Sequence, residues 1–145
     1  MSNELPIEVE SESENHTELD AEVRGHEPVV DEPEKLGGKD KGPNPLEYLF
    51  TGLAGCLNIT IHRIARQKEV EIEKLDIDVS GSLDMEEFKE GGTGKRAGFE
   101  DIRVEIEMET DSNSQVEKEI LKESETRCPV SDNIQNPTNV ELTQK

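Results

Sequence analysis

The longest helical pattern of the chain lies in its first half. Asn44-Pro45-Leu46-Glu47 places Asn at an N-cap, Pro at the first helical position and Glu at the third, which is a capping-box pattern. Apolar residues then recur at helical spacing: Leu46, Leu49, Phe50, Leu53, Leu57, Ile61, Ile64 and Ala65. Cations follow at Arg63, Arg66 and Lys68, where they suit the C-terminal end of the helix dipole. The pattern predicts a helix from about Pro45 to Gln67.

Apolar and polar residues alternate in three further segments, which is typical of strands with one solvated face. The alternating apolar residues are Leu19, Ala21 and Val23, then Leu75, Ile77 and Val79, then Phe99 and, after a slip near Asp101, Ile102, Val104, Ile106 and Met108. Two shorter alternations allow an edge strand at Ile7 and Val9 and predict a final strand at Val140 and Leu142.

The remaining segments predict a second helix and two connections. Asp111-Ser112-Asn113 caps a helix that carries Val116, Ile120 and Leu121 and ends before Cys128-Pro129. Gly-rich residues 91–96 lack the spacing of a phosphate-binding loop and precede no helix, so we interpret them as a hairpin connection. Residues 28–44, rich in Pro and Gly, form either an ordered loop or a flexible arm. The order of elements predicts an α+β domain.

Gly52 and Gly55 interrupt the long predicted helix, and each costs about 1 kcal/mol relative to Ala at such a position. Together with Ala54 they form a narrow strip that another backbone can approach closely. We therefore expect this helix to be central and to pack tightly against a second helix.

Composition and charge narrow the class of protein. The 145 residues suit one domain, and 16 Lys and Arg against 35 Asp and Glu give a net charge of −19. This charge disfavours binding to nucleic acid and to anionic membranes, and it suits a cytoplasm of high salt concentration. No apolar run approaches a membrane span, and the acidic start is unlike a secretory signal, so we expect a soluble, cytoplasmic protein. The acidic segment 1–16 is interpreted as a mobile tail.

The residues with intrinsic reactivity are two cysteines, Cys56 and Cys128. The three histidines show no metal-ligand spacing, and no serine lies in a nucleophile elbow. Two cysteines cannot form a four-cysteine zinc site, and a reducing cytoplasm disfavours a structural disulfide. The pair is therefore either buried without a chemical role or redox-active.

The local sequence around each cysteine favours a different environment. Cys56 lies inside the long helix, where a thiol buried without a partner has a raised pKa and packs as a small apolar residue. Cys128 precedes Pro129 and so occupies the N-cap of a short turn through residues 130–133, whose N–H groups would stabilise a thiolate. Physical chemistry alone thus favours Cys128 as the more acidic thiol.

Two motifs resemble those of the OsmC/Ohr family, the osmotically inducible and organic hydroperoxide resistance proteins. The segment GPNPLEYLF at 42–50, followed by Leu53-Ala54-Gly55-Cys56, resembles the central-helix motif of the family, and Cys128-Pro129-Val130-Ser131 resembles its second-cysteine motif. The resemblance covers about 17–145 and implies one OsmC-like domain there. It also implies antiparallel sheets around long central helices and an intertwined homodimer.

The same resemblance implies a cysteine-based thiol peroxidase that reduces organic hydroperoxides in stress defence. By this analogy Cys56 is the peroxidatic thiol and Cys128 the resolving thiol, which reverses the order of acidity argued above. An external dithiol restores both thiols, and no metal or organic cofactor takes part. The alternative is a non-catalytic stress or small-ligand-binding dimer whose cysteines only pack.

Two positions depart from the family pattern. The catalytic Arg of the family lies in the loop before the long helix, where residues 34–41 offer only lysines, which do not hold a carboxylate bidentately. Arg24 lies farther back, in a predicted strand. The catalytic Glu of the family directly follows the helix-opening Pro, where this chain has Leu46 and then Glu47. Arg24 and Glu47 are therefore retained as further candidate site residues.

Overall fold

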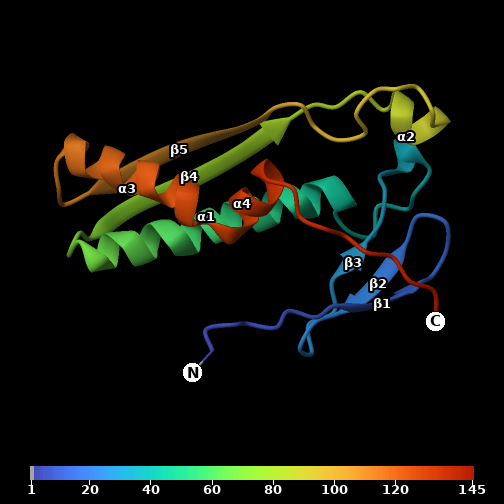
Figure 1. Ribbon diagram of the computed structural model, residues 1–145, viewed down its shortest axis with the longest axis horizontal. Helices are drawn as coiled ribbons and strands as arrows, with labels where there is room; N and C mark the ends of the chain where they lie inside the picture. Colours follow the sequence, from blue (N-terminus) through green and yellow to red (C-terminus); the bar gives the residue numbers. More distant parts are fainter. Residues whose placement is uncertain (1) are drawn as a thin grey trace. The chain divides into compact units, whose positions relative to one another are not determined.

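The computed structural model describes residues 2–145, and the chain divides into two compact units, 1–49 and 50–145. Helices and antiparallel strands follow one another in the chain (Figure 1), so the predicted α+β class is confirmed. The long helix α1 (Pro45–Gln67) has the predicted bounds and begins in the first unit. Its capping box is formed, because Asn44 Oδ1 accepts the N–H of Glu47 at 2.9 Å and Glu47 Oε1 accepts the N–H of Asn44 at 2.8 Å.

The first unit contains a three-stranded antiparallel sheet in the order β1-β2-β3. The strands are β1 (Glu10–Ser13), β2 (Leu19–Glu22) and β3 (Val29–Val30). The residues of β2 are alternately half-buried and exposed, as its sequence pattern predicts. The edge strand β1 begins after Ile7 and Val9, which are exposed, so the alternation placed this strand too early. It lies inside segment 1–16, whose mobility stays a prediction.

The pairing of β1 with β2 places like charges opposite one another. Glu10 is opposite Glu22 and Glu12 is opposite Asp20, and no ion pair found in residues 2–145 engages these carboxylates. Repulsion from Asp20 also raises the pKa of Glu14, which follows the strand. Like charges directly opposite destabilise a strand pair, so this pairing depends on ions from the solvent.

We expect potassium chloride to stabilise this strand pair, because screening lengths fall from about 10 Å at 0.1 M salt to about 3 Å at 1 M. Hydrogen exchange at Asp20 and Glu22, whose N–H groups face β1, should slow as salt rises, and the melting temperature should increase. The double variant Glu10→Gln/Glu12→Gln should lose most of this dependence, whereas Glu4→Gln/Glu8→Gln, with the same change of charge, should keep it. Equal salt dependence of both variants would contradict the role of the opposed pairs.

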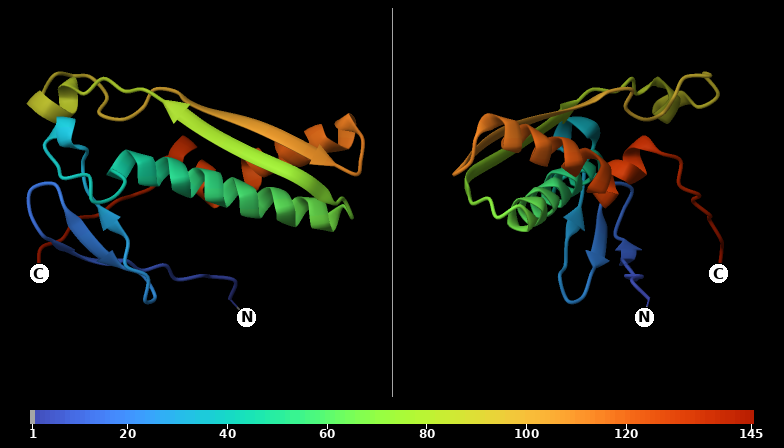
Figure 2. Two further views of the ribbon diagram at one scale, coloured as in Figure 1. Left: turned by 180° about the vertical axis from the view of Figure 1, so that it is seen from behind. Right: turned by 60° about the vertical axis from the view of Figure 1, so that its left-hand side comes forward.

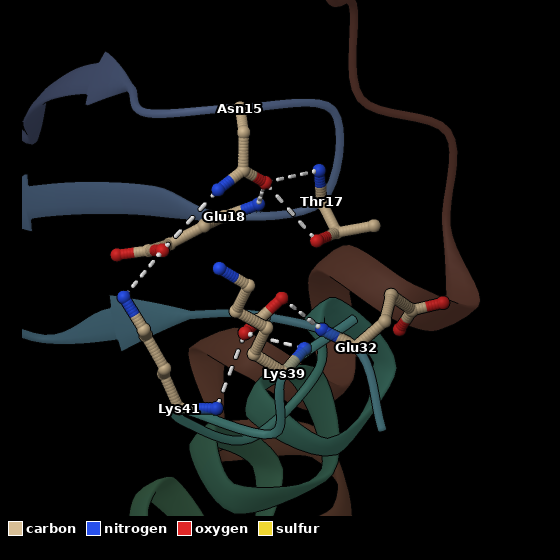
Figure 3. A network of polar contacts seen from close by, with 7 residues as sticks. Asn15, Thr17, Glu18, Glu32, Lys39 and Lys41 are labelled. Carbon is tan, nitrogen blue, oxygen red and sulfur yellow. Dashed lines mark hydrogen bonds and ion pairs between the residues drawn. The ribbon is translucent and has the colours of Figure 1, made fainter. Parts of the chain in front are cut away.

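The segment between β3 and α1 is an ordered loop, which settles the alternative left open by its sequence. Asp31 is 1% exposed, and its carboxylate accepts the N–H groups of Glu32 at 2.8 Å, Lys39 at 3.2 Å and Lys41 at 3.1 Å. Figure 3 shows the surrounding network, in which the Lys41 ammonium lies 3.2 Å from the carboxylate of Glu18. These contacts fold the loop back onto residues far from it in sequence.

Two glycines of this loop lie where another backbone segment approaches closely. A Cβ atom at Gly38 would lie 2.0 Å from the carbonyl oxygen of Glu32, and a Cβ atom at Gly42 would lie 2.1 Å from that of Val29. Since neither backbone carbonyl can move aside easily, only glycine fits at these two positions.

The hydrogen bonds of Asp31 predict how far the pH can fall before the first unit loses stability. Burial alone would raise the pKa of Asp31, but hydrogen bonds from the Thr17 side chain and from the N–H groups of Glu32, Lys41 and Lys39 outweigh it and lower the pKa from 3.8 to about 2. A carboxylate with a lowered pKa in the folded state stabilises above its unfolded pKa, and the stabilisation is lost as the pH falls through the folded value.

We therefore expect the first unit to lose stability progressively as the pH falls from about 4 to about 2. The fluorescence of Tyr48 can follow this loss, because Tyr48 is the only tyrosine and its hydroxyl donates to the carbonyl oxygen of Val29 at 2.7 Å. Asp31→Asn should already be destabilised at neutral pH and should lack this acid step. An acid transition of unchanged midpoint in Asp31→Asn would exclude Asp31 as its cause.

The second unit packs helices against a long hairpin. The hairpin strands β4 (Ile72–Gly81) and β5 (Ile102–Thr110) pair antiparallel, with Leu75 opposite Met108 and a register shift between Ile72 and Lys74. The hairpin lies alongside α1 in the views of Figures 1 and 2. The short helix α2 (Glu86–Glu90) lies in its connection, where the sequence predicts no helix. Phe99 precedes β5 and stacks on Phe50, with ring centroids 4.8 Å apart.

Two helices complete this unit, α3 (Ser114–Arg127) and α4 (Pro129–Gln135). The side chain of Asn113 accepts the N–H of Val116 at 3.0 Å, which confirms the predicted cap of α3. No strand forms at Val140 and Leu142, which are 77% and 90% exposed, so the predicted final strand is wrong. The buried core comprises Leu53, Leu57, Ile61, Ile64, Ala65, Ile120 and Cys128. The apolar faces of β4 and β5 pack against it.

Candidate redox site around Cys56 and Cys128

The fold brings the two cysteines together. Cys56 lies in the third turn of α1, and Cys128 lies between α3 and α4, both in the second unit. Both thiols are free, and the side chain of Cys56 is close enough to that of Cys128 to raise the pKa of Cys128. A redox pair requires this proximity, which the sequence alone does not show.

The two thiols differ in their access to solvent. Cys128 is fully buried, at 0% exposure, and belongs to the core cluster with Ile61, Ile64 and Ile120. Cys56 is half-buried and packs against this cluster from the surface of α1. A reagent from outside therefore meets Cys56 before Cys128.

Cys128 joins two helices. Its N–H donates to the carbonyl oxygen of Ser124 at 3.1 Å and so closes the C-terminal end of α3. Its Sγ accepts the N–H of Ser131 at 3.5 Å and so caps the N-terminal end of α4, with Pro129 at the first helical position. The predicted N-cap position of Cys128 is confirmed.

The expected acidity of Cys128 is wrong. Burial raises the pKa of the Cys128 thiol, and the side chain of Cys56 raises it further, whereas the N–H groups of Ser131 and Val130 lower it by less. The N–H donors that the sequence predicts near Cys128 are present, but the local sequence does not show that a core buries the thiol. Burial therefore favours the protonated form of the Cys128 thiol.

A groove of about 850 Å³ borders the pair. Leu53 and Leu57, which flank Cys56 on α1, line it together with Ser131, whose N–H caps onto Cys128. Six further apolar residues line it, Phe99, Ile102, Val104, Ile106, Leu121 and Ile134, and polar atoms make up the larger share of its surface. The groove therefore brings apolar and polar surface close to the pair, and neither cysteine is among its lining residues.

Four charged side chains also line this groove: Arg96, Glu100, Asp101 and Glu125. Arg96 could not be predicted from the sequence, because residues 91–96 have the pattern of a connection and their spacing indicates no site. The place of Arg96 depends on how the hairpin packs over α1 and α3, which no local pattern encodes.

The other two candidate residues belong to the first unit. Arg24 is exposed and lies in a tight turn with φ of 50°, beside the bridge between Val23 and His26, and not in a strand as predicted. The Glu47 carboxylate accepts the N–H of Asn44 in the capping box of α1. These contacts describe local structure, and the catalytic roles of Arg24 and Glu47 stay predictions.

Between residues 2 and 145, His, Cys, Asp and Glu side chains form no group of three that could hold a metal ion. None of the helices in this part of the chain has the length and apolar character that crossing a membrane requires.

Comparison with known proteins agrees with the motifs. The family described as OsmC-like protein matches residues 38–143. A hydroperoxide reductase of Mycoplasma pneumoniae is 28% identical over 102 residues, which are 70% of this chain and 69% of that protein.

Solved structures of low sequence identity share the fold. The OsmC-like protein from Mycoplasma pneumoniae superposes with a TM-score of 0.77 at 23% identity, over 90% of this chain and 88% of that one. The organic hydroperoxide resistance protein OsmC from Legionella pneumophila superposes with a TM-score of 0.64 at 19% identity, over 90% of each chain. Since the family match spans most of the chain and the fold agrees with it, the chain belongs to the OsmC-like protein family.

Proposed function

We propose that the protein is a cysteine-based thiol peroxidase that reduces organic hydroperoxides and serves in stress defence. The observation that carries the proposal is the pair itself, a half-buried Cys56 close to a fully buried Cys128, near a groove that apolar residues partly line. The name of the Mycoplasma pneumoniae relative, a hydroperoxide reductase, supports the same chemistry.

The reaction would proceed through one sulfenic acid and one disulfide. The Cys56 thiolate attacks the outer peroxide oxygen, the O–O bond breaks, and the alkoxide takes up a proton and leaves as an alcohol. Cys128 then attacks the sulfenic sulfur of Cys56, and its thiol proton leaves with the hydroxyl as water. An external dithiol reduces the disulfide. In this scheme no metal or organic cofactor is needed.

The surroundings suit an organic substrate. The apolar residues of the groove would hold the organic part of a hydroperoxide. Arg24 and Glu47 remain candidate catalytic residues. A cycle between dithiol and disulfide also requires a reducing compartment, so we place the protein in the cytoplasm.

Consumption of an organic hydroperoxide in the presence of dithiothreitol tests the proposal. The wild-type protein should consume peroxide catalytically, and Cys56→Ser should not exceed the rate without protein. Equal loss of peroxide with both proteins would contradict the proposed peroxidase activity. The alternative would then hold, a ligand-binding dimer whose cysteines only pack.

The strip at Gly52 and Gly55 supports a homodimer. A Cβ atom at either glycine would meet nothing within 4 Å among residues 2–145, so the predicted second helix does not pack there within one chain. Ile59, on the same helix, is 64% exposed. We propose that a second copy covers this face, because an exposed apolar surface on a helix is stabilised by a partner.

Sedimentation at micromolar concentration is expected to give a dimer. Gly55→Leu should shift the protein toward monomer, because a large side chain blocks the close approach of helices. Glu119→Leu, which adds the same side chain to the exposed face of α3, should stay dimeric. A wild-type monomer that is stably folded would exclude this arrangement.

A further inference from the structure

We propose that the external dithiol attacks the disulfide at Cys56, and that Cys128 leaves as a thiolate received by the first backbone N–H groups of α4. This inference rests on the disulfide of the proposed function and concerns its second half, the return to two thiols. It assigns different roles to the two sulfurs of one bond.

Access decides which sulfur is attacked. Disulfide exchange requires a thiolate to reach one of the two sulfurs directly. Cys128 has no exposed surface and lies in the core with Ile61, Ile64 and Ile120, so a nucleophile could reach its sulfur only by opening this core. Cys56 is half-buried on α1, so part of its side chain is exposed within one chain. Within each chain the disulfide therefore presents its Cys56 sulfur, and a second copy over Gly52, Gly55 and Ile59 would have to leave this sulfur open to the reductant.

The leaving sulfur needs stabilisation, because a thiolate leaves faster when its pKa is lower. Burial and the contact with Cys56 raise the pKa of Cys128, which by themselves would slow its departure. The N–H group of Ser131 lies 3.5 Å from Sγ, and the N–H groups of Ser131 and Val130 both lower the pKa of this thiol. Because Cys128 is the N-cap residue, these donors are next to its sulfur in the chain and remain near it when the bond forms.

The exchange balances in two steps. The first thiolate of the dithiol bonds to the sulfur of Cys56, the bond between Cys56 and Cys128 breaks, and its electron pair goes to Cys128, which then takes up a proton. The second thiolate of the dithiol then attacks the reductant sulfur of this mixed disulfide, which is the sulfur bonded to Cys56. Cys56 leaves as a thiolate, and the reductant leaves as an oxidised, cyclic disulfide.

The two sulfurs can be distinguished by trapping the mixed disulfide. The full-length protein is oxidised with diamide, and the loss of two hydrogens is confirmed by intact mass. It is then exposed briefly to mercaptoethanol, a monothiol that cannot complete the second step, and quenched with acid. Free thiols are alkylated with N-ethylmaleimide under denaturing conditions, and peptide mapping locates both labels.

We expect the mercaptoethanol adduct on Cys56 and the maleimide on Cys128, with a preference of at least about tenfold over the reverse pattern, because attack requires access. The same sequence of steps in concentrated guanidinium chloride is the control, and there the preference should disappear. An adduct mainly on Cys128, or equally on both cysteines in the folded protein, would overturn the inference.

The choice of oxidant distinguishes a failure of this inference from a failure of the proposed function. A disulfide that forms with diamide but not with an organic hydroperoxide would overturn the peroxidase, while an adduct on Cys56 would still support the direction of attack. Failure of diamide to form any disulfide would overturn both.

Discussion

Treatment with an organic hydroperoxide is expected to convert the wild-type protein completely to a disulfide form lighter by two hydrogens. The expectation follows from the contact between the two thiols, since a sulfenic acid on Cys56 would form within reach of Cys128. Bonding requires Cα atoms within about 7 Å, and the proximity of the two side chains is compatible with such a separation. Intact-mass spectrometry measures the outcome.

Two variants assign the roles in this oxidation. With Cys128→Ser, Cys56 should gain oxygen and remain a sulfenic acid or a more oxidised acid, because nothing resolves it. With Cys56→Ser, Cys128 should stay reduced, because it is buried and holds its proton. Oxidation of Cys128 in the Cys56→Ser protein, at the rate seen for Cys56, would reverse the assignment.

Gly38→Ala is expected to destabilise the first unit by about 3 kcal/mol or more, at the upper end for added volume in a packed region. The new Cβ would lie 2.0 Å from the carbonyl oxygen of Glu32 and 2.8 Å from a carboxylate oxygen of Asp31. Relief of this clash would move the loop away from Asp31 and break the hydrogen bonds that this carboxylate accepts.

Tyr48 fluorescence during urea unfolding reports this effect, because its hydroxyl bonds to Val29 within the first unit. Gly98→Ala is the matched control, since a Cβ there would meet nothing within 4 Å among the residues that the structure describes. A wild-type midpoint for Gly38→Ala would show that the loop tolerates a side chain at this position.

Much of the fold could be predicted because its signals are local. The bounds of α1 follow from a capping box of four consecutive residues and from an apolar stripe along the same helix. The cap of α3 at Asn113 and the pairing faces of β4 and β5 are encoded in the same way. Each of these elements depends on neighbours within a few positions of the chain.

The features that could not be predicted depend on distant contacts. The pKa of Cys128 is raised because side chains of α1 and α3 bury the thiol. The N-cap prediction used only residues next to Cys128 in the chain, so it did not account for this burial. The order of the loop after β3 depends on Asp31, which holds the N–H groups of residues eight and ten positions away. Val140 and Leu142 alternate like a strand, yet no neighbouring strand pairs with them in residues 2–145.

The acidic pairs of β1 have a consequence for behaviour at high protein concentration. β1 is the outer strand of its sheet, and all four of its residues are exposed. An exposed outer strand offers unpaired backbone groups on which another chain can add a strand, and this is a route to aggregation. A second copy that paired there would bring its own carboxylates next to Glu10 and Glu12. The charge that weakens β1 within one chain therefore also keeps its open edge from joining other copies.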